Sequence, residues 1–378
     1  MKKIFIILLI LLMSGCYNYK ELNQISIISS IAIDKDDDEY KVSAQIMNAK
    51  EDEESENSQV IVYTEKGKTI NEALRKMTLK APNNLYGGHL SKLVLSEEVA
   101  KEGIINVLDV FQRLTEVRNE FTITVSKGID ASDVIKVMTA PESVPAEYVT
   151  TSLKSADIAS ALTYSTKLDE FVSLYLKEYI DPVIAVVEVE DYKKKGTTTD
   201  NTATTDPISK LVLGNIAVTK DGKLERYLTE NETIGYNFVR NQVQEMIIPV
   251  KCDDNNYSSI SILGNETKTD VNKINNKYKV NINIKTNAII AEYNCSDNLT
   301  KEKTIKKLEK ATEKKIKYYV DKSINAQNET KGKFLGIERT IYLDYPEYKN
   351  ENFDISVNAD VNLSRKGEIR NSSKGAKK

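Results

Sequence analysis

Apolar and polar positions change period repeatedly along the chain, from the two-residue repeat of strands to the helical repeat and back. Residues 25–33 (ISIISSIAI) are apolar and β-branched, and residues 40–46 (YKVSAQI) alternate as a half-buried strand does. The DKDDDE segment between them lacks the glycine and the final glutamate of a calcium loop, so we expect a hairpin turn. The same patterns predict further strands at 59–67, 91–96, 121–128 and 182–190.

Helical repeats separate these strands. Thr69 and Glu72 have the spacing of a capping box, and apolar residues then recur on one helical face. The helices predicted in this half span residues 70–77, 104–114, 132–138 and 167–179. Strands and helices therefore alternate as far as residue 191.

Residues 192–206 (YKKKGTTTDNTATTD) have no apolar periodicity and many threonines, which predicts a linker between two domains. Beyond it, residues 210–229 predict two strands around an Asp221-Gly222 turn, and long strands follow at 258–293. The final strand is expected at 353–364.

A helix of about 25 residues is predicted before that last strand, because apolar residues recur there at helical spacing. Its stripe consists of Ile305, Leu308, Ala311, Ile316, Tyr319, Val320 and Ile324. The opposite face mixes lysines with glutamates, which favours a solvated face with ion pairs over a phosphate-binding one.

These patterns predict an α+β, multi-domain fold in which mixed and antiparallel sheets pack with helices and the C-terminal domain contains a long helix. The expected divisions are a signal peptide (1–15), an N-terminal domain (16–191), the linker (192–206), a C-terminal domain (207–372) and a disordered tail (373–378). A further subdivision near Lys251 is left open.

The N-terminus has the pattern of a lipoprotein signal. Lys2 and Lys3 precede ten apolar residues, and Ser14 and Gly15 lead into Cys16. A membrane-spanning helix needs about 20 apolar residues, so this run fits a cleaved leader better. We expect Cys16 to become the first residue and to carry S-diacylglycerol and N-acyl groups. The alternative is an ordinary leader in which this cysteine is incidental.

Charge and cysteine content narrow the function classes. The formal net charge of −3 argues against a nucleic-acid partner, which needs a concentrated basic surface. With Cys16 acylated, Cys252 and Cys295 remain as an even pair in an exported chain. They either form a disulfide, if their strands lie side by side, or stay as two buried thiols.

Motifs for catalysis and cofactor binding are missing from the sequence. The one histidine, His89, cannot form a two-histidine metal site, and no G-x-S-x-G element supplies a nucleophile for it. We interpret His89 as a structural residue that follows two glycines at the start of a strand. No P-loop, dinucleotide fingerprint or cysteine cluster occurs, so we expect no catalytic residues, no metal and no cofactor.

Four blocks in order resemble the Ger(x)C family, the C-subunit lipoproteins of spore germinant receptors. The first and second blocks carry Glu21, Leu22, Asn23, Ala32, Ile33 and Asp34, then His89, Ala100, Glu102, Gly103 and Arg113. The third and fourth carry Gly214, Ala217, Val218, Leu228, Glu232, Thr233 and Gly235, then Gly336, Tyr345, Pro346, Phe353 and Gly367. The family commonly has tryptophans where Tyr17 and Tyr348 stand here.

This resemblance implies a non-enzymatic subunit, lipid-anchored on the outer face of the spore inner membrane. Its implied partners are two polytopic germinant-receptor subunits, one A-type and one B-type. The nutrient and its contact with this subunit are not implied. The alternatives are a lipid-anchored solute-binding protein of a transporter, disfavoured by the absence of tryptophan and of a βαβ pattern after residue 250, and an envelope hydrolase, for which no catalytic group is found.

Overall fold

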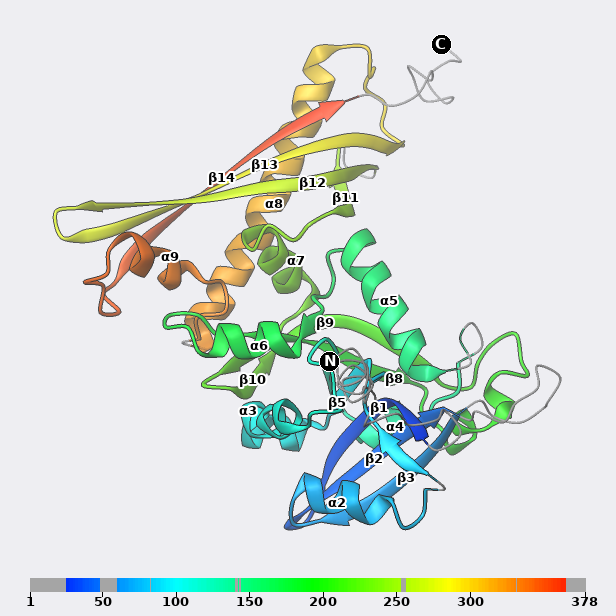
Figure 1. The fold of residues 1–378 in the computed structure, drawn as a ribbon. Coiled ribbons are helices and arrows are strands. Elements are labelled where there is room, and N and C mark those ends of the chain that lie inside the picture. Colours follow the sequence, from blue (N-terminus) through cyan, green and yellow to red (C-terminus); the bar gives the residue numbers. More distant parts are fainter. Residues whose placement is uncertain are drawn as a thin grey trace, which may run out of the picture.

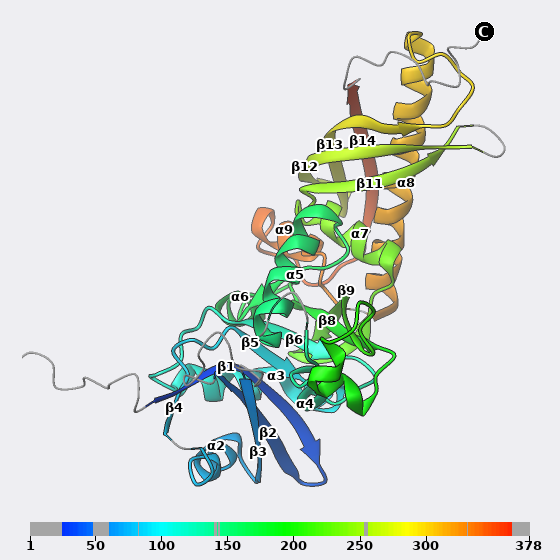
Figure 2. The same cartoon turned by 90° about the vertical axis from the view of Figure 1, so that its right-hand side faces the viewer.

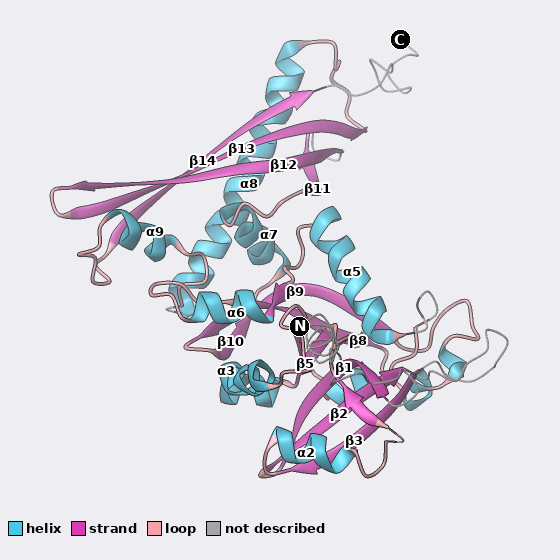
Figure 3. Ribbon diagram, in the orientation of Figure 1, coloured by secondary structure: helices cyan, strands magenta, loops and turns pink. Residues whose placement is uncertain are grey.

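The computed structural model describes residues 25–47, 60–81, 83–139, 142, 144–252, 256–330 and 332–364. Within these residues the chain forms a ten-stranded sheet and a four-stranded sheet, both packed against helices (Figures 1 and 3). The two sheets lie at opposite ends of an elongated molecule, which Figure 2 shows from the side. This mixed architecture confirms the α+β class.

The larger sheet has the strand order β10-β9-β8-β6-β5-β1-β2-β3, with β4 beside β1 and β7 beside β6. The bounds of its strands are β1 (Ile25–Asp36), β2 (Glu39–Met47), β3 (Val60–Gly67), β4 (Asn84–Tyr86), β5 (Lys92–Leu95), β6 (Thr122–Ser126), β7 (Thr166–Lys167), β8 (Val183–Glu190), β9 (Lys210–Lys220) and β10 (Lys223–Tyr227). Strands β1, β5, β6 and β8 are parallel to one another, whereas the outer strands are antiparallel. Every residue of β5 and β6 is buried, as expected for parallel strands covered on both faces.

Helices cover both faces of this sheet. The cluster that contains Ile31 and Ile33 packs under α2 (Ile70–Met77), α3 (Glu97–Arg113) and α6 (Leu168–Tyr175). The intervening Ala32 faces the other side, under α4 (Ala131–Val134) and α5 (Pro145–Ala159). Successive side chains of a strand point to opposite faces, so one apolar run supplies both cores.

The smaller sheet has the order β11-β12-β13-β14. Its strands are β11 (Glu245–Lys251), β12 (Tyr257–Ile274), β13 (Lys277–Tyr293) and β14 (Phe353–Ser364), and its helices are α7 (Glu230–Val239), α8 (Glu302–Thr330) and α9 (Ile337–Asp344). Helix α8 buries Ile305, Leu308, Ile316, Tyr319 and Val320. The predicted long C-terminal helix is therefore confirmed, and its polar face carries an i,i+4 ion pair between Lys306 and Glu302 at 2.6 Å.

The larger sheet continues across the expected linker. Strand β9 pairs with β8 from Val183↔Val218 to Glu190↔Lys210, so β9 and β10 extend the N-terminal sheet. The residues between form the short 3-10 helices η2 (Lys194–Thr197) and η3 (Thr199–Asn201). Asn201 is 1% exposed and its Nδ2 donates to the carbonyls of Met138 and Ser209, at 2.6 and 3.0 Å. These hydrogen bonds hold the segment in place, although its sequence has no apolar periodicity.

The chain also stays within one sheet across residue 251. Strand β11 ends at Lys251 and pairs with β12 along its whole length, from Glu245↔Leu263 to Lys251↔Tyr257. None of the helices in the described ranges is long and apolar enough to cross a membrane. The expected signal segment and the 373–378 tail lie outside those ranges.

Candidate functional site

The predicted lipidation site, Cys16, lies outside the described residues. The first described residue is Ile25, which begins β1 and pairs with Asn84 of β4. Eight residues lie between Cys16 and Ile25 in the sequence. Lipidation stays a prediction from the sequence.

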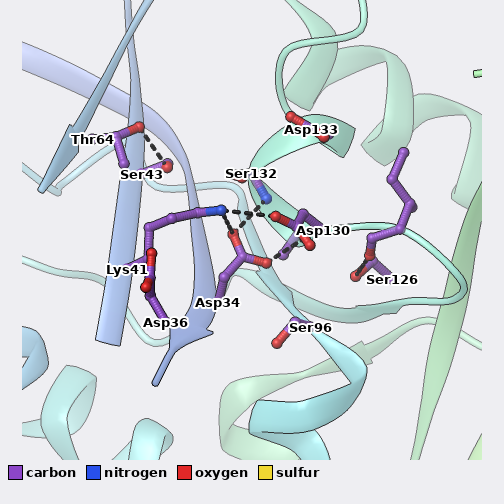
Figure 4. A network of polar contacts seen from close by, with 12 residues as sticks. Asp34, Asp36, Lys41, Ser43, Thr64, Ser96, Ser126, Asp130, Ser132 and Asp133 are labelled. Atoms are coloured by element: carbon purple, nitrogen blue, oxygen red, sulfur yellow. Dashed lines mark hydrogen bonds and ion pairs between the residues drawn. The ribbon is translucent and has the colours of Figure 1, made fainter. Parts of the chain in front are cut away.

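Asp34, a residue of the first Ger(x)C-like block, forms a buried polar connection between β1 and α4 (Figure 4). Its Oδ1 accepts from the backbone N–H of Ala131 at 2.6 Å and its Oδ2 from that of Ser132 at 3.0 Å. Lys41 Nζ lies 3.7 Å from Asp34 Oδ2 and 2.8 Å from Asp130 Oδ2. The carboxylate therefore satisfies two N–H groups at the start of α4 that have no helical partner.

Burial governs the electrostatics of this connection. Asp34 is 1% exposed, and its desolvation raises the pKa of the carboxyl, against the opposing effects of Lys41 and the two N–H donors. A side chain so enclosed cannot meet a substrate from solution. We therefore assign Asp34 a role in holding α4 against the β1–β2 hairpin.

Gln45 makes a second buried connection on β2. Its Oε1 accepts from Ser29 Oγ at 2.9 Å, and its Nε2 donates to the carbonyl of Ile135 at 2.7 Å. The N–H of Ala146, at the start of α5, also donates to Oε1 at 3.4 Å. One amide thus links the sheet to the end of α4 and the start of α5.

Two residues of the second block lie where α3 contacts the β9–β10 turn and β1. Gly103 has φ +152° and interrupts the helical backbone, and the next N–H, of Ile104, donates to the carbonyl of Gly222 at 2.8 Å. Glu102 pairs with Lys35 of β1 at 2.9 Å. A glycine suits this position because L side chains rarely adopt such a φ.

The third block lies at the α7–α8 contact. Glu232 accepts from the N–H of Thr229 at 2.7 Å and pairs with Arg226 at 2.8 Å, which fixes the start of α7. A Cβ on Gly235 would lie 2.0 Å from the carbonyl oxygen of Tyr319 on α8. The glycine therefore allows the backbones of the two helices to approach closely.

The fourth block forms part of the contact between the two sheets. The hydroxyl of Tyr179 donates to the carbonyl of Tyr348 at 3.0 Å, and Asp181 Oδ2 accepts from the N–H of Lys333 at 2.7 Å. Tyr348, which stands near an expected tryptophan, is 2% exposed and packs edge-on against Tyr278 at 5.4 Å between ring centroids. Tyr348 therefore provides the aromatic packing at a position near which the family commonly has tryptophan.

His89 does not have the packing role that we expected. It is exposed, and its ring lies edge-on to Tyr86 with 6.3 Å between centroids. The two preceding glycines are the buried residues of this turn. Within the described ranges, no three His, Cys, Asp or Glu side chains are grouped so as to hold a metal ion.

Cys252 and Cys295 form a disulfide in the structure, with Cα atoms 6.2 Å apart. Cys252 follows β11 and Cys295 follows β13, and both strands flank β12. Both cysteines are 8% exposed and belong to the core of the smaller sheet. The bond closes the end of this sheet.

A buried lysine, Lys92, gives no signal in the sequence. Lys92 on β5 is 1% exposed, and burial lowers the pKa of its ammonium to about 7 despite the opposing effect of Asp157. Burial likewise raises the pKa of Asp157, on α5, to about 6. Among the described residues, neither Lys92 Nζ nor Asp157 Oδ1 has a hydrogen-bond partner. Lysines are common at the start of apolar runs, so nothing in the sequence indicates that this one is buried.

A cavity of about 680 Å³ lies between β1, α2 and the end of α3. Its floor is apolar, and Arg75 and Arg113 contribute to its walls. Arg113 is held by Asp109 in a two-pronged ion pair at 2.8 and 3.0 Å. The block residues thus contribute contacts between elements in several places.

Comparison with known proteins identifies the family of the chain through two matches. Residues 18–189 match the family described as spore germination protein N-terminal domain, and residues 214–372 match the family described as spore germination B3/GerAC like, C-terminal. The chain belongs to the Ger(x)C family. This is the germinant-receptor C-subunit family of spore germination.

Individual relatives cover most of this Ger(x)C chain. Spore germination protein KC of Bacillus subtilis (strain 168) is 27% identical over 355 residues, 91% of this chain and 87% of that protein. Spore germination protein B3 of the same organism is 24% identical, covering 91% of this chain and 89% of its own length. The crystal structure of the GerBC protein shares the fold, with a TM-score of 0.52 at 18% identity, over 88% of this chain and 96% of that one.

Proposed function

We propose that this Ger(x)C protein is the lipid-anchored, non-enzymatic C subunit of a nutrient germinant receptor, and that it acts by assembly with an A-type and a B-type membrane subunit. The observation that carries the proposal is the pair of family matches, which cover both halves of the chain in order. Several block residues support it, because Asp34 and Glu232 accept from backbone N–H groups at helix starts and Gly235 allows two helices to approach closely.

The proposed location is the outer face of the spore inner membrane. The nine residue-to-residue steps from Cys16 to Ile25 span at most about 30 Å, at about 3.3–3.6 Å for each extended residue. Several acyl chains on one cysteine bind a bilayer firmly, since each buried methylene contributes about 0.8 kcal/mol. An anchored chain of this kind holds its first strand close to the membrane subunits.

Labelling with a fatty-acid analogue tests the anchor. Cys16→Ala is expected to abolish the label, whereas Cys252→Ser, which changes a cysteine of the folded region, is expected to keep it. Equal labelling of the Cys16→Ala chain would show that the lipid is not attached there.

Germination assays test the receptor role. Spores without the protein, in a strain with no related C subunit, are expected to respond poorly to the nutrients of its receptor. They should still germinate with a trigger that acts downstream of the receptors. Normal germination with every nutrient, together with reduced uptake of one solute in growing cells, would instead indicate a solute-binding protein.

A further inference from the structure

Strand β14 is an unprotected edge of the smaller sheet (Figure 1). It pairs in parallel with β13 without a register shift, from Phe353↔Tyr278 to Ser364↔Ile289, and no other described strand pairs with it. Proteins commonly block a free edge with proline, lysine or a bulge, and β14 has none of these. A long regular edge of this kind can accept another strand.

One side-chain contact shows which backbone groups face the open side. The N–H of Leu363 donates to Glu309 Oε1 of α8 at 3.1 Å, so it is not used by β13. Alternate residues of a strand direct their N–H and C=O groups to the same edge. The backbone groups of Ile355, Val357 and Ala359 therefore face the open side, and no described strand pairs with them there.

Helix α8 covers only the final part of this edge. Val361 and Leu363 are 3% and 6% exposed, whereas Ile355, Val357 and Ala359 are only half-buried although they face the core. An added strand along Phe353–Ala359 would remove this remaining apolar surface from water.

The outer face of the sheet determines the chemistry of such a strand. Asp270 on β12 can only accept as a carboxylate, and Asn283 Nδ2 donates to it at 2.9 Å. Asn283 Oδ1 then accepts from Asn358 Nδ2 of β14 at 3.1 Å. This order leaves Asn358 Oδ1 as the last acceptor of the hydrogen-bond chain. Asp354 and Asp360 are exposed on the same face of β14, and Lys279 and Lys285 of β13 lie opposite them in the strand register. On the side away from β13, the exposed row of β14 thus offers an amide oxygen and two carboxyl groups as acceptors.

We propose that the open edge of β14, Phe353–Ala359, binds an extended segment of a partner protein in which apolar residues alternate with hydrogen-bond donors such as Asn, Thr, Lys or Arg. The apolar residues cover Ile355 and Val357, and the donors meet Asn358 and the aspartates. The partner's identity as a membrane subunit of the receptor rests on the proposed function.

Two substitutions at Val357 block the edge, and one serves as a control. Val357→Pro removes an N–H that β13 does not use, which is where an edge strand tolerates proline. Val357→Lys keeps the N–H but places a charge on the core-facing side of the edge strand, and inward-pointing charges of this kind protect natural sheet edges. Val357→Thr keeps both the N–H and the β-branched shape.

The test is co-purification of the full-length tagged chain with the A- and B-type subunits from detergent-solubilised spore membranes. Since each 1.4 kcal/mol is tenfold in affinity, the loss of one backbone hydrogen bond should reduce retention by up to about tenfold for Val357→Pro. We expect a similar loss for Val357→Lys and wild-type retention for Val357→Thr. A photo-crosslinker in place of Asn358 should attach to one of the two subunits.

Other outcomes overturn the inference, each in a recognisable way. Equal retention of all three Val357 variants removes the edge as the contact but leaves the receptor role intact. If the wild-type chain itself is not retained, the proposed function fails and this inference with it. A dimer that Val357→Pro dissociates identifies a second copy as the occupant, and faster amide exchange at Val357 after deletion of residues 365–378 identifies the chain's own tail.

Discussion

The close approach of α7 and α8 at Gly235 gives a prediction whose size follows from the geometry. A Cβ there would lie 2.0 Å from the carbonyl oxygen and 2.6 Å from the carbonyl carbon of Tyr319, and 2.8 Å from the Cβ of Ser323. The shortfall from a favourable separation of about 3.5 Å is about 1.5 Å, and the obstacle is backbone that cannot change rotamer. Gly235→Ala therefore has to push α7 away from α8.

Two opposing effects determine how much Gly235→Ala changes the free energy of unfolding. Overpacking costs about 1–3 kcal/mol, and contact with backbone places this site at the upper end. Alanine returns about 1 kcal/mol relative to glycine within a helix. We expect Gly235→Ala to lower the free energy of unfolding by about 2 kcal/mol.

Urea unfolding of the chain without its signal segment, followed by circular dichroism, measures this loss. Gly214→Ala is the matched control, because nothing lies within 4 Å of a Cβ at that position in β9. It should leave the unfolding midpoint almost unchanged. If Gly235→Ala were as stable as Gly214→Ala, the two helices could not be packed as closely as the structure shows.

Three further predictions concern buried charge, the disulfide and the single histidine. The pKa of Lys92 is lower in the folded than in the unfolded chain. Burial of its charge therefore lowers the free energy of unfolding in full below pH 7, and this loss fades as the pH rises towards 10.5. Lys92→Met should raise the urea midpoint at pH 7 and have a smaller effect at pH 10. The Cys252–Cys295 bond spans a separation of 43 residues, so reduction or replacement of both cysteines by serine should cost about 2–4 kcal/mol, and a chain equally stable with and without reductant would contradict this. His89 is exposed, so His89→Gln should change the unfolding free energy by less than about 0.5 kcal/mol, and a larger loss in the same urea assay would show a contact that the geometry lacks.

Local patterns predicted those elements whose residues are stabilised by neighbours in sequence. The apolar stripe from Ile305 to Ile324 predicted α8, because a helix places residues three and four apart on one face. The Asp221-Gly222 turn predicted the β9–β10 hairpin, and Thr69 with Glu72 predicted the start of α2, where Thr69 accepts from the N–H of Glu72 at 3.1 Å. The four Ger(x)C-like blocks identified the family, although the pattern did not show what each residue does.

Contacts between distant segments were decided only by the tertiary structure. No local signal tells that β9 joins β8 across a Thr-rich segment, because strand pairing depends on long-range backbone hydrogen bonds that any sequence can make. The same is true of Asp34, which meets α4 almost a hundred residues later, and of Lys92, which is buried and interacts electrostatically with Asp157 of α5. The open edge of β14 is likewise a property of the sheet order. The sequence by itself determined the elements, the predicted anchor at Cys16 and the family, since these depend on neighbouring residues, while the fold decided which side chains and backbone groups remain available to a partner.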